Sequence, residues 1–131
     1  MLIHKLSTAE GLALIRNARK SNSRLFASVS VFNLAFEDKD LETFDANLKL
    51  FPPLRSAADR SALLKGLKDG SIDLIVSDHQ PMNPERKDLE FQAAGFGAIS
   101  LETAYSLMRT SLPDELGDEL LGLGERPLLL Q

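Results

Sequence analysis

The sequence predicts an α/β protein in which parallel strands are flanked by helices, in an order that corresponds to about half of a (β/α)8 barrel. Two observations support this fold class. The run 72–76 is almost entirely β-branched or aliphatic, which is typical of a strand buried on both faces of a parallel sheet. Along the rest of the chain, apolar strand-like runs alternate with segments that carry apolar residues at helical spacing.

The N-terminal part of the chain predicts a strand, a helix and a second strand. The first strand is expected over residues 2–6, because this short apolar run stops at Ser7 and Thr8. Either hydroxyl can cap a helix that ends near Asn22. The apolar face of that helix comprises Leu12, Leu14, Ile15 and Ala18. A second buried strand is expected over residues 25–32.

The middle of the chain predicts a long connection and a helix. Residues 33–51 contain only a short helical turn near residues 38–44, and loops of this length are often functional. Ser56 is expected to open the next helix, which stops at Asp69 and Gly70. Its inner face carries Leu63, Leu64 and Leu67. The helix then leads directly into the central strand.

The C-terminal part begins with a polar segment, residues 83–92, and a stretch at 93–97 whose glycines let backbone approach a ligand closely. Helices are expected over residues 101–110 and from Pro113 onward. The chain ends in an apolar tail, residues 128–130, for which the sequence indicates no internal partner.

Composition limits the classes of function. The 131 residues suit one domain, and 44% of them are hydrophobic, which is enough for a core. Lysine and arginine are scattered and the net charge is -4, so we expect no nucleic-acid partner. No apolar run approaches membrane-spanning length, and the cytoplasm is the expected compartment. With no cysteine and only His4 and His79, few residues are available to bind zinc.

The candidate functional residues follow the central strand. Asp78 and His79 come directly after it, and the carboxyl ends of parallel strands carry the chemistry in barrels and open α/β sheets. Asp78 is therefore a candidate base or metal ligand. The alternative is that Asp78 only caps the following turn, where aspartate is favoured.

Several short segments occur in order along the chain. Ser77-Asp78-His79-Gln80-Pro81 is followed by Lys87-Asp88-Leu89-Glu90-Phe91 and then by Leu101-Glu102-Thr103-Ala104. These segments resemble the Asp-His-Ala-Pro-His, Glu-Phe and Gly-Leu-Glu-Thr motifs of the dihydroorotase family. Phe96-Gly97 resembles the family's Pro-Phe-Gly. Asp45, Asn47, Lys49 and Pro52-Pro53-Leu54-Arg55 resemble its Asp-Thr-Asn-Phe-Lys-Val-Asn-Pro-Pro-Leu-Arg loop, and Ser7-Thr8-Ala9 resembles its His-Val-Ser-Thr-Ala.

This resemblance implies a fold and an activity. It implies that residues 1–131 form a single half-barrel region, corresponding to the C-terminal half of a family barrel. Dihydroorotases interconvert carbamoyl-aspartate and dihydroorotate, using zinc to polarise the amide and activate water. By resemblance, Asp78 is the carboxylate that moves the proton. The residues that correspond to substrate-binding positions are Asn47, Arg55, His79 and Gly97.

The departures from the family motifs affect the metal site. The zinc-binding histidine before the family's Ser-Thr is Lys5 here, and His4 falls one position earlier, where strand alternation points it to the opposite face. The first histidine of the family's Pro-His-His-Leu is Phe32. Two further positions, the second histidine of Asp-His-Ala-Pro-His and the asparagine before Pro-Pro, are Met82 and Phe51. Only Asp78 remains of the metal ligands, so we expect no bound metal or other cofactor.

Each candidate residue also has a purely structural interpretation. His79 can form hydrogen bonds within the scaffold, and Arg55 can pair with Asp59 at helical spacing. Phe32, Phe51 and Met82 can be core-filling replacements that close an empty pocket.

Three hypotheses about function follow. In the first, the chain is a non-catalytic dihydroorotase-like protein, retained as a structural partner in a pyrimidine-pathway assembly, and aspartate carbamoyltransferase is the first partner to test. In the second, it is an active zinc-dependent amidohydrolase whose missing ligands come from a longer chain or another subunit. In the third, it is a piece of a longer protein, because half a barrel leaves sheet edges that must be covered by a second copy or by the missing half.

Overall fold

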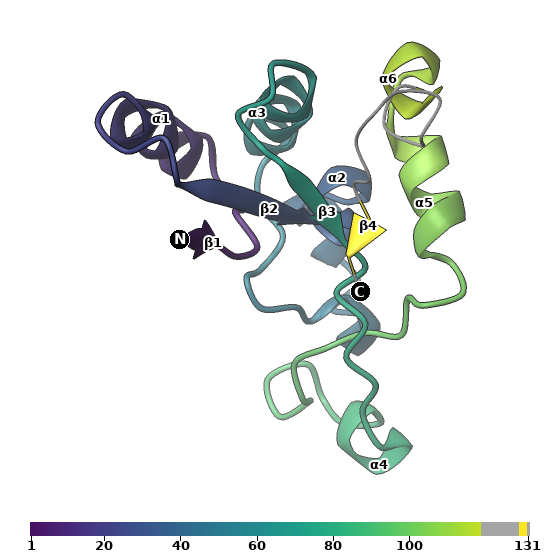
Figure 1. Cartoon of the computed structure of the whole chain (residues 1–131). Helices are drawn as coiled ribbons and strands as arrows, with labels where there is room; N and C mark the ends of the chain where they lie inside the picture. Colours follow the sequence, from purple (N-terminus) through teal and green to yellow (C-terminus); the bar gives the residue numbers. More distant parts are fainter. Residues whose placement is uncertain (119–128, 131) are drawn as a thin grey trace.

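The structure is a computed structural model that describes residues 1–118 and 129–130 (Figure 1). Its sheet has four strands in the order β1-β2-β3-β4, and each neighbouring pair is parallel. The strands are β1 (Leu2–Ile3), β2 (Phe26–Ser30), β3 (Leu74–Val76) and β4 (Leu129–Leu130). The helices are α1 (Ala9–Arg19), α2 (Val31–Ala35), α3 (Ala57–Lys68), α4 (Pro84–Lys87), α5 (Ala104–Ser111) and α6 (Asp114–Asp118), with 3-10 turns η1 (Asp38–Leu41) and η2 (Ala46–Leu48). The predicted α/β class with a parallel sheet is confirmed.

Helices α1 and α3 pack side by side on the sheet (Figure 1). Thr8 caps α1 by accepting a hydrogen bond from the Gly11 amide at 3.1 Å, and Ser56 caps α3 as the sequence predicts. A Cβ atom at Gly66 of α3 would lie 2.9 Å from a methyl carbon of Leu12. The absence of a side chain at Gly66 therefore lets the two helices approach closely.

The first strand and helix are shorter than predicted. Strand β1 ends at Ile3 because Lys5 adopts a left-handed backbone conformation, with φ of 56°. Helix α1 ends at Arg19, three residues before Asn22. Its buried face is also narrower than predicted, because Leu14 is 64% exposed and only Leu12 and Ile15 of the four predicted positions are buried.

The second strand ends before Phe32, which lies in α2 instead. The Ser30 side chain accepts a hydrogen bond from the Phe32 amide at 3.3 Å and caps the helix there. The prediction of a strand over residues 25–32 is therefore wrong at its end. This cap places Phe32 directly beyond the carboxyl end of β2.

In the C-terminal part, α5 begins at Ala104 rather than Leu101, because the Ser100 carbonyl accepts hydrogen bonds from the amides of Thr103 and Ala104. Helix α6 begins directly after Pro113, as predicted. The prediction that the apolar tail has no internal partner is wrong, since Leu129–Leu130 form β4 and pair with β3. Leu128 lies outside the described residues.

The core lies between the sheet and the helices. Its fully buried apolar side chains come from the central strands and from every long helix: Leu12, Val29, Val31, Leu34, Leu63, Ile75 and Met108. Helix α2 packs against both α3 and α5, so it joins the two halves of the helical layer. Among the described residues, no helix is both long and apolar enough to cross a membrane.

Candidate functional site

The carboxyl edge of the sheet brings together residues that follow β1 and β3. The ammonium Nζ of Lys5 lies 2.8 Å from Oδ1 of Asp78, and the two side chains are only 12% and 6% exposed. The same ammonium donates a second hydrogen bond, of 2.9 Å, to the Phe51 carbonyl. Lys5 therefore connects two strand ends and the 33–51 connection in one buried ion pair.

Asp78 is held in an uncommon backbone conformation, with φ of 55°. Its carboxylate accepts its hydrogen bond from the Lys5 side chain, and in residues 1–118 and 129–130 it accepts none from a backbone amide. The alternative in which Asp78 only caps the following turn is therefore wrong. Asp78 is the counter-ion of Lys5.

His4 does not replace Lys5 at this edge. Nδ1 of His4 lies 3.0 Å from Oγ of Ser28 on β2, and the Lys5 amide donates to the same hydroxyl at 3.0 Å. The prediction from strand alternation does not apply, because the strand ends at Ile3. His4 and Lys5 are instead separated by the left-handed turn at Lys5.

The His79 side chain is hydrogen-bonded to the backbone of the protein. Its Nδ1 accepts hydrogen bonds from the Ser100 and Leu101 amides, at 3.1 and 3.2 Å. Nδ1 is therefore an acceptor, and the neutral ring carries its proton on Nε2. The segment around His79 also pairs with Ala98 in a parallel bridge. His79 thus fixes the return of residues 98–101 alongside the end of β3.

The other residues that the family resemblance identified are scattered. Gly97 is buried with φ of 128°, and a Cβ there would lie 2.6 Å from the Gln80 carbonyl oxygen, so the position requires glycine. Asn47 lies on the wall of a pocket, which is described below. Arg55 is exposed and does not line this pocket. The four residues that correspond to the family's substrate-binding positions therefore do not line one common pocket.

The predicted Arg55–Asp59 pair does not form within the described residues. Asp59 instead accepts hydrogen bonds from the Ala9 amide at 2.8 Å and from the Ser56 hydroxyl at 2.7 Å. These bonds, with the one from Ala9 first, hold the pKa of Asp59 below its usual range, and the charge of Arg55 adds only a smaller effect. Asp59 joins the N-termini of α1 and α3.

The pocket has a volume of about 290 Å³ and lies between α2, η2 and the start of α5. Phe32 and Met82 are on its walls, so they narrow the site but do not close it. Phe51 is 68% exposed and packs edge to face on Phe96, with ring centroids 6.0 Å apart. The prediction that all three residues fill the core is therefore wrong for Phe51, and the pocket remains open.

The residues at the sheet edge do not fit a zinc ion. No group of three or more His, Cys, Asp or Glu side chains comes together in the described part of the chain. Asp78 is already paired with a cation, and a divalent ion beside it would be repelled by the Lys5 ammonium. The phenyl ring of Phe32 has no donor atom. This arrangement can hold an ion pair but offers too few ligands for zinc.

Sequence reasoning missed several functional candidates. Lys5 was identified only as a lost ligand, although it is the partner of Asp78. Gln80, Lys87 and Thr103 belong to segments that resemble family motifs but were given no binding role, yet all three line the pocket. The polar character of residues 83–92 gave no indication that one lysine turns inward, because a surface helix has the same composition.

No protein-family profile matches the chain. Solved structures establish its class. L-Hydantoinase (dihydropyrimidinase) from Arthrobacter aurescens matches with a TM-score of 0.79 and 28% identity, over 90% of this chain and 28% of that one. D-Hydantoinase (dihydropyrimidinase) from Thermus sp. matches with a TM-score of 0.71 and 22% identity, over 83% of this chain and 25% of that one. The fold is that of part of an amidohydrolase.

Curated relatives establish the family. Dihydroorotase from Bacillus subtilis is 45% identical over 105 residues, which are 80% of this chain and 24% of the relative. Dihydroorotase from Carboxydothermus hydrogenoformans is 45% identical over 107 residues, which are 82% of this chain and 25% of the relative. The chain belongs to the dihydroorotase family, and it spans about a quarter of the length of these relatives.

Proposed function

We propose that this chain is a dihydroorotase-like protein of pyrimidine biosynthesis that does not itself hydrolyse cyclic amides and serves as a structural component. The observation that carries this proposal is the buried ion pair between Lys5 and Asp78, with a separation of 2.8 Å. The sequence identity to dihydroorotases supports a role in pyrimidine biosynthesis. The ion pair at the carboxyl edge of the sheet supports the absence of catalysis.

The ion pair opposes catalysis for a physical reason. A metal-dependent amide hydrolase needs a Lewis acid to polarise the carbonyl and to activate water, and a carboxylate free to move the proton. Here the carboxylate of Asp78 is held by an ammonium group that also bonds to the Phe51 carbonyl. An ammonium group cannot coordinate water as a metal does. Asp78 therefore has a structural role in this proposal.

The strand order supports a partial (β/α)8 barrel as the architecture. The four parallel strands follow one another in sequence order without a reversal. Crossovers between neighbouring parallel strands are right-handed, so a sheet without a reversal keeps its helices on one face, as a barrel does. Figure 1 shows α1, α3 and α5 along one side of the strands. In this proposal the sheet is a segment of a barrel wall.

Metal analysis and an activity assay test the proposal. Protein purified without chelator is expected to contain no stoichiometric zinc and to convert dihydroorotate no faster than a metal-free blank. Lys5→His and Phe32→His, alone or together, are expected not to restore turnover, because the resemblance implies that the family's metal site also uses a His-x-His pair, for which the described residues offer no counterpart. Zinc at one ion per chain, lost on Asp78→Ala and kept in the surface control Asp88→Ala, would overturn the proposal.

The second candidate is an active amidohydrolase whose other ligands come from a longer chain or another subunit. It is favoured by one observation, that the chain spans only about a quarter of its relatives. Mixing the chain with the remainder of a bacterial dihydroorotase, expressed separately, distinguishes the two. Turnover that appears on mixing and disappears with Asp78→Asn supports the second candidate, whereas a stable but inactive complex supports the first.

Two kinds of partner are proposed, one from the open sheet edge and one from the pathway of the related enzymes. A second copy of the chain or the missing part of a barrel would cover the free sheet edge, and aspartate carbamoyltransferase is the first pathway enzyme to test. The cytoplasm is the compartment in which such an assembly would work. Co-purification with aspartate carbamoyltransferase from the same organism, compared with the chain alone, tests this part of the proposal.

A further inference from the structure

The pocket of about 290 Å³ is separate from the ion pair, since neither Lys5 nor Asp78 lines it. One wall comes from α2, which packs against α5, and the opposite walls come from η2 and the segment after β3. Its volume lies near the lower end of the range of small-molecule sites, about 300–1,000 Å³. It therefore suits a ligand of about one ring with a substituent.

The charge on the described lining of the pocket is positive. Among the described residues that line it, Lys87 carries the one charged side chain, and none of them carries a carboxylate. The Lys87 ammonium donates to the Ala46 carbonyl at 2.6 Å, which leaves two of its three N–H groups for another partner. Burial lowers the pKa of Lys87, against a smaller opposing effect of Asp45 and a further lowering by Lys49. A bound anion would offset this cost of burying the ammonium.

Two neutral amides stand beside the lysine. Asn47 and Gln80 are exposed residues that line the pocket, and their side-chain amides make no hydrogen bond within the described part of the chain. Each amide offers a donor and an acceptor. Thr103 is a third neutral polar residue of the wall. The apolar part of the wall includes Phe32, Phe36 and Met82, which provide flat and polarisable surfaces. One positive group, three neutral polar residues and an apolar surface thus meet in one cavity.

We propose that this pocket binds a small organic monocarboxylate with a flat apolar body, with its carboxylate at Lys87 and its body against Phe32 and Met82. A single ammonium matches one negative charge, and Asn47 or Gln80 can donate to the second carboxylate oxygen. A phosphate dianion would leave one charge without a cationic partner. This proposal goes beyond the proposed function, because it requires neither a metal nor turnover.

Benzoate and benzamide form a matched pair of probes, because they share a ring and differ in charge. Each is titrated into the ¹⁵N-labelled full chain, and backbone resonances are followed by NMR. Benzoate is expected to give saturable shifts at residues 46–48, 80–82 and 103–107, with an affinity about ten-fold or more above that of benzamide. Inorganic phosphate is the third probe and is expected to bind more weakly than benzoate.

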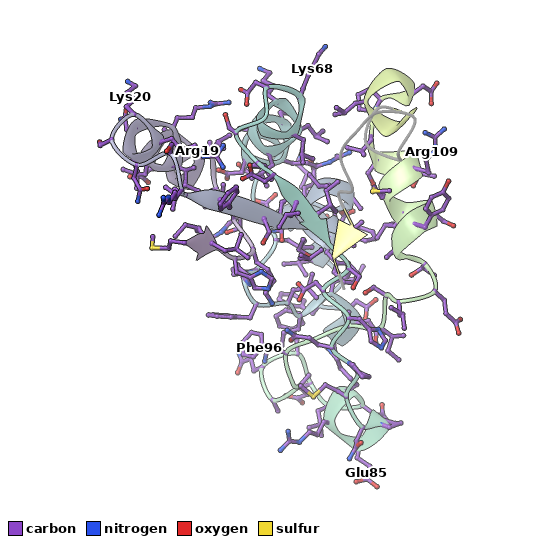
Figure 2. All side chains as sticks on the ribbon, viewed as in Figure 1. Arg19, Lys20, Lys68, Glu85, Phe96 and Arg109 are labelled. Atoms are coloured by element: carbon purple, nitrogen blue, oxygen red, sulfur yellow. The ribbon has the colours of Figure 1, made fainter. Side chains whose placement is uncertain are left out.

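Substitutions test whether the Lys87 ammonium binds the carboxylate of benzoate. Lys87→Met keeps the aliphatic stem and is expected to weaken benzoate binding about ten-fold and to abolish its advantage over benzamide. Lys68→Met is the control, because Lys68 is an exposed lysine that projects from α3 away from the pocket (Figure 2). If Lys87→Met fails to fold, Asn47→Ala replaces it and is expected to weaken benzoate about three-fold or more.

Three results would overturn the proposal: absence of saturable shifts with benzoate, equal affinities for benzoate and benzamide, or tighter binding of phosphate. Unchanged benzoate binding by a folded Lys87→Met protein would overturn it as well. None of these measurements depends on zinc content or dihydroorotate conversion. Failure of the binding proposal is therefore distinguishable from failure of the proposed function.

Discussion

Lys5 and Asp78, which are far apart in sequence and follow two different strands, form a buried ion pair with an Nζ to Oδ1 distance of 2.8 Å. Both residues have positive φ angles, 56° and 55°. Left-handed backbone is uncommon for residues with a side chain, and it persists where the surroundings compensate for it. The ion pair and the bond from Lys5 to the Phe51 carbonyl provide that compensation.

The first prediction concerns this pair. Lys5→Met or Asp78→Asn alone is expected to lower the free energy of unfolding by about 3 kcal/mol or more, because each leaves a buried polar or charged partner without its counter-ion. The double variant is expected to lose clearly less than the sum of the two. Urea unfolding followed by circular dichroism measures all three values. Additive losses would show that the two side chains do not interact.

This pair also shows how far sequence reasoning reaches. The strand at β3 and the position of Asp78 after it could be predicted, because apolar periodicity and the direction of parallel strands are local and general properties. The pairing with Lys5 could not, since it depends on a left-handed turn at Lys5 that no local pattern requires. Alternation along the assumed strand 2–6 could not be applied to His4 and Lys5, because the strand ends at Ile3.

The second prediction concerns Asp59, whose carboxylate accepts hydrogen bonds from the Ala9 amide and the Ser56 hydroxyl. These bonds lower its pKa in the folded protein below the usual value of 3.8. Its contribution to stability is therefore fully present above that usual value and is lost as the pH falls through the lower folded value. Asp59→Ala is expected to cost about 1.5 kcal/mol at pH 7 and less at pH 2.

Glu85→Ala is the control for this prediction, because Glu85 is exposed and projects outward from α4 (Figure 2). Its unfolding free energy is expected to follow that of the wild-type protein at both pH values. Thermal or urea unfolding between pH 2 and pH 7 provides the comparison. A loss for Asp59→Ala that is the same at both ends of this range would contradict a role for the ionised carboxylate.

The third prediction concerns Phe32 and Phe51, for which the sequence predicted the same core-filling role. Phe32 is 5% exposed within the core, whereas Phe51 is 68% exposed. Phe32→Ala is expected to cost about 3 kcal/mol, because it creates a cavity, while Phe51→Ala is expected to cost less than about 1 kcal/mol. Urea midpoints compared at equal m-values measure both. Similar losses for the two variants would show that the Phe51–Phe96 contact is part of the core.

The different burial of these two residues could not be predicted from the sequence. Both are phenylalanines at positions where the family motifs have polar residues, so the same substitution predicted the same outcome. Their burial is decided by tertiary context: Ser30 caps α2 and directs Phe32 inward, whereas Phe51 lies in a connection on the surface. The pocket was likewise beyond prediction, because its walls come from four separate segments.

The free edge of β1 is the last feature with a testable consequence. In the described sheet β1 pairs only with β2, so the other side of β1 leaves backbone N–H and C=O groups without strand partners. Apolar side chains lie at this edge, where Leu2 is 46% exposed and its neighbour in register, Phe26, is 49% exposed. Strand edges of this kind favour pairing with another chain.

The fourth prediction is that the chain self-associates through β1. Light scattering over a micromolar concentration series is expected to show a mass that rises with concentration. Leu2→Lys is expected to shift the protein toward the monomer, because a charged side chain at a strand edge disfavours further pairing. Leu14→Lys is the control, since Leu14 is 64% exposed on α1, away from the strand edge, and its variant is expected to associate like the wild-type protein. A mass equal to one chain at every concentration would contradict the prediction, and an equal effect of both lysine variants would place the association on another surface.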